Sequence, residues 1–182
     1  MKDELALREQ FLSSTRVFDG QLIQVSVDTV QLPNGKTGRR EVVRHPGAVA
    51  VLAINAENKV ILVEQFRHAG GEILLEVPAG KLDISGEPPE QCAFRELAEE
   101  TPYTAQQMTL LYTFYTAAGF CDELLYLYQA EGVQKNSQAQ LDEDEFVRHV
   151  YLSKEEAHIA LREGRIRDSK TIIALQYWLL SS

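Results

Sequence analysis

The rhythm of hydrophobic and polar positions differs between the first 45 residues of this chain and the remainder. In the first part, β-branched residues at near-alternate positions predict strands over residues 15–44. Pro33-Asn34-Gly35 predicts a turn within this stretch, and residues 3–12 are expected to form a short helix. We therefore expect a small antiparallel β unit over residues 1–45.

After the break at His45-Pro46-Gly47, short apolar runs alternate with segments of helical composition. The expected strands cover residues 48–55, 60–65, 73–77, 108–115, 124–130 and 147–152. The first two are expected to form a hairpin around Ala56-Glu57-Asn58. The expected helices cover residues 90–100, 154–163 and 169–180. This order of elements predicts an α/β sandwich with a mixed sheet over residues 46–182.

Each expected helix begins with residues that suit a helix start. Pro88-Pro89 fits the first turn of the first helix, where a backbone N–H has no partner to lose. Ser153 and Glu156 have the spacing of a capping box. Asp168 or Ser169 is expected to cap the last helix.

The helix over 90–100 has an unusual distribution of charge. Glu96 and Glu100 are four residues apart and Glu99 is three from Glu96, so all three lie on one side. Like charges at this spacing destabilise an isolated helix by about 0.2–0.5 kcal/mol per pair. A divalent cation such as Mg²⁺ would offset this repulsion. A solvated acidic face is the alternative interpretation. Arg95, which can reach Glu99 four residues on, and the glycine-bearing turn before the helix favour the metal site.

These residues belong to a longer motif. The stretch GKLDISGEPPEQCAFRELAEETPY, residues 80–103, resembles the Nudix box. In that box a Gly is followed after five residues by Glu, and after seven more by Arg-Glu-aliphatic-any-Glu-Glu-any-Gly-aliphatic. Here Gly80 and Glu87 are separated by six residues, and Pro102 stands where the family has Gly. Since proline cannot adopt positive φ and disfavours a helical residue before it, the helix is expected to end by Glu100 or Thr101.

The resemblance extends beyond the box, to the ADP-ribose pyrophosphatase branch of the Nudix hydrolases. The matching segments are EQFR at 64–67, EVPAGKLD at 76–83, FYTAAGFCDE at 114–123, LDEDEF at 141–146 and SKTIIALQYW at 169–178. It implies a Nudix-type α/β/α sandwich over 46–182 and a homodimer in which the N-terminal unit, 1–45, contributes to dimerisation and to the adenosine pocket. Such enzymes have a Pro sixteen residues beyond the box Gly, where this chain has Ala118.

The resemblance also implies roles for individual residues. The implied ligands of Mg²⁺, or of Mn²⁺, are Glu96, Glu99, Glu100 and the backbone carbonyl of Ala79. Glu87 would pair with Arg95 as a structural brace. Glu143 or Glu145 would activate water, with Glu99 beside the metal as a further catalytic residue. The candidate substrate-binding residues are Arg67, Phe120 and Glu123. Phe66 is the alternative to Phe120 for stacking on a base, and either ring is otherwise ordinary packing. The acidic run over 142–145 is otherwise a solvated charge cluster, and Arg67 is otherwise a surface charge.

Composition narrows the classes of partner. The 182 residues carry a net charge of −9, which argues against binding nucleic acid through a basic surface. The two cysteines, Cys92 and Cys121, lack metal-site spacing, and we expect reduced thiols in a cytoplasmic protein. No apolar run approaches the ~20 residues that span a bilayer, and the polar N-terminus is not expected to be a signal peptide.

The sequence therefore predicts a Mg²⁺-dependent hydrolase of a nucleoside diphosphate linked to another group. The resemblance implies ADP-ribose as the substrate, with AMP and ribose 5-phosphate as products. Three alternatives remain open at this stage. They are a pyrophosphatase for nucleotide sugars or dinucleoside polyphosphates, a non-catalytic Nudix-fold ligand sensor, and an acidic structural domain without a metal site.

Overall fold

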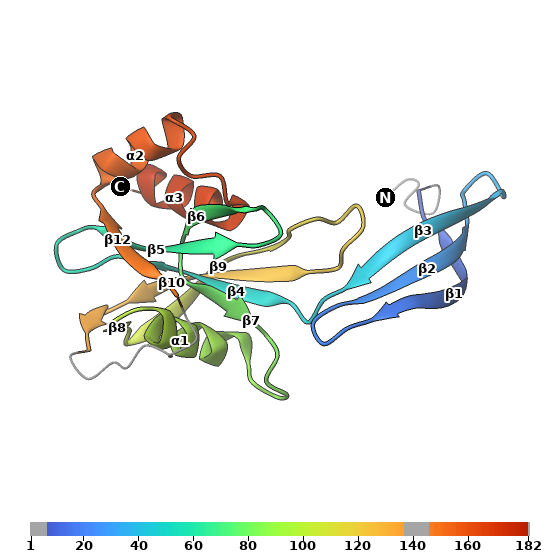
Figure 1. Cartoon of the computed structure of the whole chain (residues 1–182), viewed down its shortest axis with the longest axis horizontal. Helices are drawn as coiled ribbons and strands as arrows, with labels where there is room; N and C mark the ends of the chain where they lie inside the picture. Colours follow the sequence, from blue (N-terminus) through green and yellow to red (C-terminus); the bar gives the residue numbers. More distant parts are fainter. Residues whose placement is uncertain (1–6, 137–145, 182) are drawn as a thin grey trace. The chain divides into compact units, whose positions relative to one another are not determined.

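The computed structural model describes residues 7–136 and 146–181. The chain forms two compact units. Unit 1 comprises Met1–Gly47 with Tyr115–Leu124, and unit 2 comprises Ala48–Phe114 with Leu125–Ser182. The elements of both units are labelled in Figure 1.

Unit 1 contains a three-stranded antiparallel sheet with the order β1-β2-β3. Its strands are β1 (Gln10–Asp19), β2 (Gln24–Gln31) and β3 (Thr37–Arg44). Gly35 has φ +80° in the turn before β3, a backbone conformation that glycine adopts without strain. The predicted helix over 3–12 is wrong for the described residues 7–12. Residues 7–9 form no helix, and the segment from residue 10 pairs with the β-branched strand β2.

Residues 115–124 also belong to unit 1, which no sequence pattern indicated. The Val43 N–H donates to the carbonyl of Phe120, and the Asp122 N–H donates to the carbonyl of Val43, at 2.7 and 3.1 Å. Arg44 Nη1 donates to Asp122 Oδ2 at 2.9 Å. These contacts attach the segment to the end of β3.

Unit 2 is built on two sheets and a short strand pair. A four-stranded sheet has the order β7-β4-β10-β9, a three-stranded sheet has the order β12-β5-β6, and β11 pairs with β8. The strands are β4 (Ala48–Ala53), β5 (Val60–Arg67), β6 (Glu72–Glu76), β7 (Ala79–Lys81), β8 (Tyr103–Thr104), β9 (Gln107–Tyr115), β10 (Leu124–Glu131), β11 (Gln134–Lys135) and β12 (Arg148–Leu152). Because β4 pairs parallel with β10 and antiparallel with β7, the predicted mixed sheet is confirmed.

The predicted turn at 56–58 is present, since the Asn55 N–H donates to the Lys59 carbonyl at 2.9 Å and Ile54 and Val60 form an antiparallel bridge. The predicted pairing of the two strands as a hairpin is wrong, because β4 and β5 enter different sheets. Both strands contain apolar stretches that are buried on both faces. Each strand is buried within its own sheet.

Two hydrophobic cores lie on opposite faces of these strands. Ala48, Ala50 and Leu52 of β4 belong to one core, whereas Val49 and Val51 belong to the other. This division follows from the alternation of side chains along a strand. One core includes residues of α2 (Lys154–Arg162) and α3 (Ser169–Leu180), and the other includes residues of α1 (Pro89–Glu100).

The helices lie accordingly on both sides of the strands, α1 on one and α2 with α3 on the other (Figure 1). The predicted α/β sandwich is confirmed. Ser153 and Glu156 form the predicted capping box of α2. The Asp168 side chain accepts from the Thr171 N–H at the start of α3.

Candidate active site

Helix α1 is fixed in unit 2 by its buried face, which includes Cys92, Ala93 and Leu97. Its start is as predicted, with Pro88 as the N-cap residue and Pro89 in the first turn. Its last residue is Glu100, and Thr101 is extended at φ −142° and ψ 157°. The predicted effect of Pro102 on the helix end is therefore confirmed.

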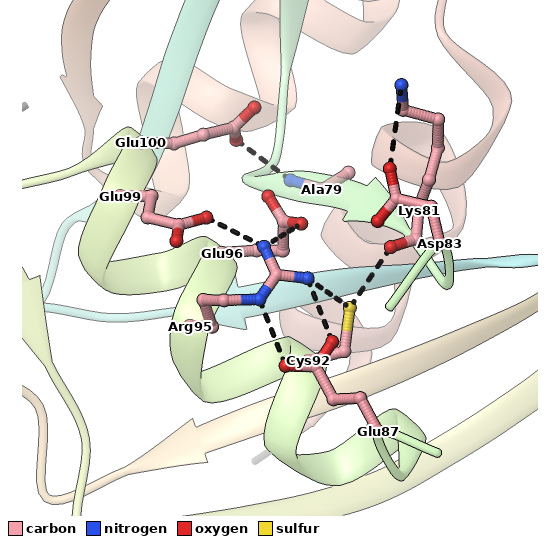
Figure 2. Close-up of polar contacts among 9 residues, drawn as sticks. All are labelled: Ala79, Lys81, Asp83, Glu87, Cys92, Arg95, Glu96, Glu99 and Glu100. Atoms are coloured by element: carbon pink, nitrogen blue, oxygen red, sulfur yellow. Dashed lines mark hydrogen bonds and ion pairs between the residues drawn. The ribbon is translucent and has the colours of Figure 1, made fainter. Parts of the chain in front are cut away.

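Arg95 is the centre of a cluster of ion pairs on this helix (Figure 2). Its guanidinium donates to both carboxylate oxygens of Glu87, at 3.0 and 2.9 Å. Nη1 also donates to Glu96 and Glu99, each at 2.7 Å. Hydrogen bonds from Arg95 lower the pKa of Glu87, and those to Glu87 raise the pKa of Arg95. The predicted brace between Glu87 and Arg95 is present.

The second conspicuous feature is the close approach of β7 to the same helix. Glu100 Oε2 accepts from the backbone N–H of Ala79 at 2.9 Å. A Cβ atom at Gly80 would lie 1.9–2.2 Å from the carboxylate atoms of Glu96. Any side chain at position 80 would therefore displace that carboxylate. Figure 2 shows Glu96, Glu99, Glu100 and Ala79 around this approach.

These residues fit a hard divalent cation by their chemistry. Glu96 and Glu100 are 7% and 3% exposed, and the donors are carboxylate oxygens, the class that Mg²⁺ prefers. One guanidinium serves Glu87, Glu96 and Glu99, so the cluster carries excess negative charge. Among the described residues, no three His, Cys, Asp or Glu side chains converge as a ready metal cage. Arg95 and the Ala79 N–H hold the oxygens instead.

Arg67, predicted to meet a phosphate, lies at the end of β5 in a second network of unit 2. Its Nε and Nη2 donate to the two carboxylate oxygens of Glu76 at 2.8 and 2.7 Å. Lys170 of α3 also donates to Glu76 and pairs with Asp168 at 3.0 Å. The hydrogen bonds to Glu76 raise the pKa of Arg67. The arginine is thus more than a loose surface charge, and its phosphate role stays a prediction.

Phe120 and Glu123, the other predicted substrate-binding residues, lie in unit 1. Phe120 is exposed and lines a pocket of about 430 Å³ with Arg40 and Tyr115. Glu123 Oε2 accepts from the Thr116 hydroxyl at 2.5 Å. The pocket is lined by both an aromatic ring and a guanidinium, groups that suit a nucleotide, and the substrate roles of Phe120 and Glu123 stay predictions.

The proposed catalytic base falls outside the described residues, since Glu143 and Glu145 both lie within 137–145. Cys92 is buried, and burial raises the pKa of its thiol to about 12, in keeping with a packing residue. No helix among the described residues is long and apolar enough to cross a membrane.

Sequence reasoning missed the long-range partners of the site. Lys170 meets Glu76 across 94 positions of sequence, and His149 bonds the Glu100 carbonyl across 49. Neither contact has a local signal. The close contact between Gly80 and Glu96 had one signal in the sequence, namely that Gly80 is the first residue of the box motif.

Two regions of the chain match known protein families. Residues 43–175 match the NUDIX domain, and residues 9–43 match the nucleoside diphosphate sugar hydrolase N-terminal domain. A solved structure described as an ADP compounds hydrolase superimposes with a TM-score of 0.80 over 95% of both chains, at 21% identity. This structural likeness shows the fold.

Named relatives cover most of the chain. A methanol dehydrogenase activator of Bacillus methanolicus is 49% identical over 170 residues, 93% of this chain and 91% of that protein. An ADP-ribose pyrophosphatase of Bacillus subtilis (strain 168) is 44% identical over 173 residues, 94% of this chain and 93% of that protein. A GDP-mannose pyrophosphatase of Yersinia pestis (strain Pestoides F) is 38% identical over 143 residues, 74% of this chain and 71% of that protein. The predicted Nudix-type architecture is confirmed, and the chain belongs to the Nudix hydrolase family.

Proposed function

We propose that this protein hydrolyses the diphosphate bridge of ADP-ribose, giving AMP and ribose 5-phosphate. The observation that carries the proposal is the placement of Glu96 and Glu100 at one helix end against the backbone of Gly80 and Ala79, with Glu99 bonded to the same arginine as Glu96. The 44% identity to an ADP-ribose pyrophosphatase over nearly the whole chain supports this substrate.

In this proposal Glu96, Glu99, Glu100 and the carbonyl of Ala79 would hold Mg²⁺, with Mn²⁺ as a substitute. The bound cation would neutralise charge on the diphosphate and acidify a water. The work of the chain is positional. Arg95 orients Glu96 and Glu99, and the Ala79 N–H orients Glu100, so that the three carboxylates are kept at one end of α1, from which they would turn to the cation.

The reaction consumes one water. An oxygen of water bonds to one phosphorus, the bridging P–O bond breaks, and the proton passes to a carboxylate. We assign that carboxylate to Glu143 or Glu145, with Glu99 as a further catalytic residue. A carboxylate base is suited to the step because a positioned group that accepts a proton typically contributes 10²–10⁴-fold to the rate.

We assign substrate contacts to three further residues. Arg67 would meet a phosphate oxygen, since a guanidinium fork suits that geometry. Phe120 would stack on the base, and its 59% exposure leaves the ring accessible. Glu123 would accept hydrogen bonds from ribose hydroxyls or the base. We further propose a cytoplasmic homodimer, supported by the exposed apolar residues Phe11, Val17 and Phe18 of β1.

The decisive test is product analysis after incubation with ADP-ribose and Mg²⁺. We expect AMP and ribose 5-phosphate in equal amounts from the wild type. The variants Glu96→Gln and Glu100→Gln should each lower kcat by orders of magnitude while the circular dichroism spectrum stays unchanged. Near-normal rates in both variants would remove the metal-site assignment. Tight ADP-ribose binding without AMP release would identify a ligand sensor instead.

A second candidate function is hydrolysis of nucleotide sugars. It is favoured by the 38% identity to a GDP-mannose pyrophosphatase and by Ala118 in place of the proline of ADP-ribose pyrophosphatases. A panel of ADP-ribose, GDP-mannose and diadenosine polyphosphates, compared by kcat/KM with Mg²⁺, separates the two. We expect the highest kcat/KM for ADP-ribose.

A further inference from the structure

The end of helix α1 departs from the Nudix box, because position 102 is proline where the box has glycine. A glycine just beyond a helix end commonly adopts positive φ and donates its N–H to a carbonyl of the last turn. Position 102 is proline, which has no N–H and cannot reach positive φ. The last four carbonyls of any helix need partners from elsewhere. The carbonyls at this end lie beside Glu99 and Glu100, so their partners bear directly on the site.

One partner is supplied by the residue before the proline. The Thr101 hydroxyl donates to the Leu97 carbonyl at 2.5 Å, and its oxygen accepts from the Tyr103 N–H at 3.3 Å. Thr101 is fully buried, with 0% exposure. A side chain therefore supplies the donor for one of the last four carbonyls of α1.

The second partner comes from β12. His149 Nε2 lies 2.9 Å from the carbonyl oxygen of Glu100. A carbonyl oxygen only accepts, so Nε2 carries the hydrogen and donates it. His149 is in register with Val63 of β5, in the middle of a regular antiparallel ladder. The donor is thus mounted on a rigid strand, on which side-chain direction is fixed.

A neighbouring contact holds the other side of Pro102. Tyr151 lies two residues after His149, on the same face of β12. Its ring meets that of Tyr103 edge to face, with centroids 6.1 Å apart and planes at 69°. Strand β12 therefore contacts the chain on both sides of Pro102, through His149 at Glu100 and through Tyr151 at Tyr103.

We propose that His149 is a positioning residue that donates to the last carbonyl of α1 and so fixes the main chain at Glu100. The inference rests on the proposed function, in which Glu100 is a metal ligand. With its main chain held by His149 and its carboxylate held by the Ala79 N–H, Glu100 is fixed at both ends. Loss of such an outer partner typically costs 10–100-fold in metal affinity.

The test compares His149→Phe, which keeps a ring without a donor, with His149→Gln, which keeps an N–H donor. Mn²⁺ binding is measured by electron paramagnetic resonance in the absence of substrate. We expect His149→Phe to weaken Mn²⁺ binding about tenfold and to lower kcat with little change in KM for ADP-ribose. His149→Gln should recover most of both. His158→Phe, on the exposed side of α2, is the matched control and should leave both unchanged.

Unchanged Mn²⁺ binding in His149→Phe, or failure of His149→Gln to recover Mn²⁺ binding, would overturn the proposal.

A readout without metal separates this proposal from the proposed function. Amide hydrogen exchange over residues 98–103 should be faster in His149→Phe than in the wild type, in metal-free protein. If exchange there is unchanged, the cap is not held by His149. If exchange changes but wild type neither binds Mn²⁺ nor releases AMP, the capping role stands and the proposed function fails.

Discussion

At the scale of single residues, the candidate site depends on which atoms are absent as much as on which are present. Gly80 lets the carboxylate of Glu96 lie against the backbone of β7, where a Cβ would come within 1.9–2.2 Å. Pro102 removes an N–H from the end of α1, and Thr101 and His149 donate to carbonyls there. Each of these residues therefore affects the backbone next to a carboxylate of the candidate site.

Gly80→Ala should lower kcat for ADP-ribose hydrolysis by about tenfold or more, because the added methyl group displaces Glu96. Gly70→Ala is the matched control, since its Cβ would meet nothing closer than 3.6 Å and its φ is ordinary. Steady-state kinetics with Mg²⁺ checks the pair. Equal activities of the two variants would show that the Glu96 pose is not needed.

Glu76 is 1% exposed and bonded to both Arg67 and Lys170. Glu76→Gln leaves two cations around a neutral amide and should cost about 3 kcal/mol in the free energy of unfolding. Urea denaturation at pH 7 measures this cost. A loss below 0.5 kcal/mol, the range of ordinary surface substitutions, would mean that solvent already screens the network.

The same carboxylate predicts a pH dependence. Burial raises the pKa of Glu76, but hydrogen bonds from Arg67 and the charge of Lys170 outweigh it, so the pKa lies below the usual 4.5. Its contribution to stability is therefore full above pH 4.5 and is lost as the pH falls through the lowered folded pKa. The gap in unfolding free energy between wild type and Glu76→Gln should shrink below pH 4.5, as checked by urea titrations at several pH values.

At the scale of elements, the starts of the three helices were predicted correctly from the sequence. Ser153 and Asp168 cap helices as the sequence indicated, because capping is a contact between near neighbours in the chain. Pro88 precedes α1 because the first turn of a helix needs no backbone N–H. The pairing of strands was harder to foresee. β4 and β5 resembled a hairpin, yet each joins its own sheet, because pairing depends on distant strands such as β10 and β12.

Ser153→Ala tests the independence of α2 from the site. It removes the hydroxyl that accepts from the Glu156 N–H and should cost about 1 kcal/mol of stability. Because α2 holds none of the proposed site residues, kcat should stay within twofold of the wild type. Thermal unfolding and steady-state kinetics check the two halves of this expectation, and a large fall in kcat would contradict it.

At the scale of the whole molecule, the proposed homodimer would account for the exposed apolar side chains of β1. Every residue of β1 is exposed, including Phe11, Leu12, Val17 and Phe18. Apolar side chains concentrated on one exposed strand are typical of an interaction surface. The match of residues 9–43 to a family-specific N-terminal domain agrees with a dedicated role for this unit.

Val17→Lys combined with Phe18→Lys should convert the dimer into a monomer, because two ammonium groups would be desolvated in the interface. Sedimentation velocity at several protein concentrations measures the change. Leu180→Lys, at an 86% exposed site on α3, is the control and should leave the dimer intact. A wild-type chain that sediments as a monomer at all concentrations would refute the assembly.

The sequence by itself determined what depends on near neighbours: the three helices after residue 88 and the caps of α2 and α3, the acidic stripe of α1, and the end of α1 before Pro102. These follow from spacing, proline geometry and the reach of side chains within a few turns. Only the tertiary structure decided how β4 and β5 pair, that residues 115–124 join unit 1, and that Lys170 and His149 support the site. Such contacts join residues many positions apart, and the packing of the whole chain selects them.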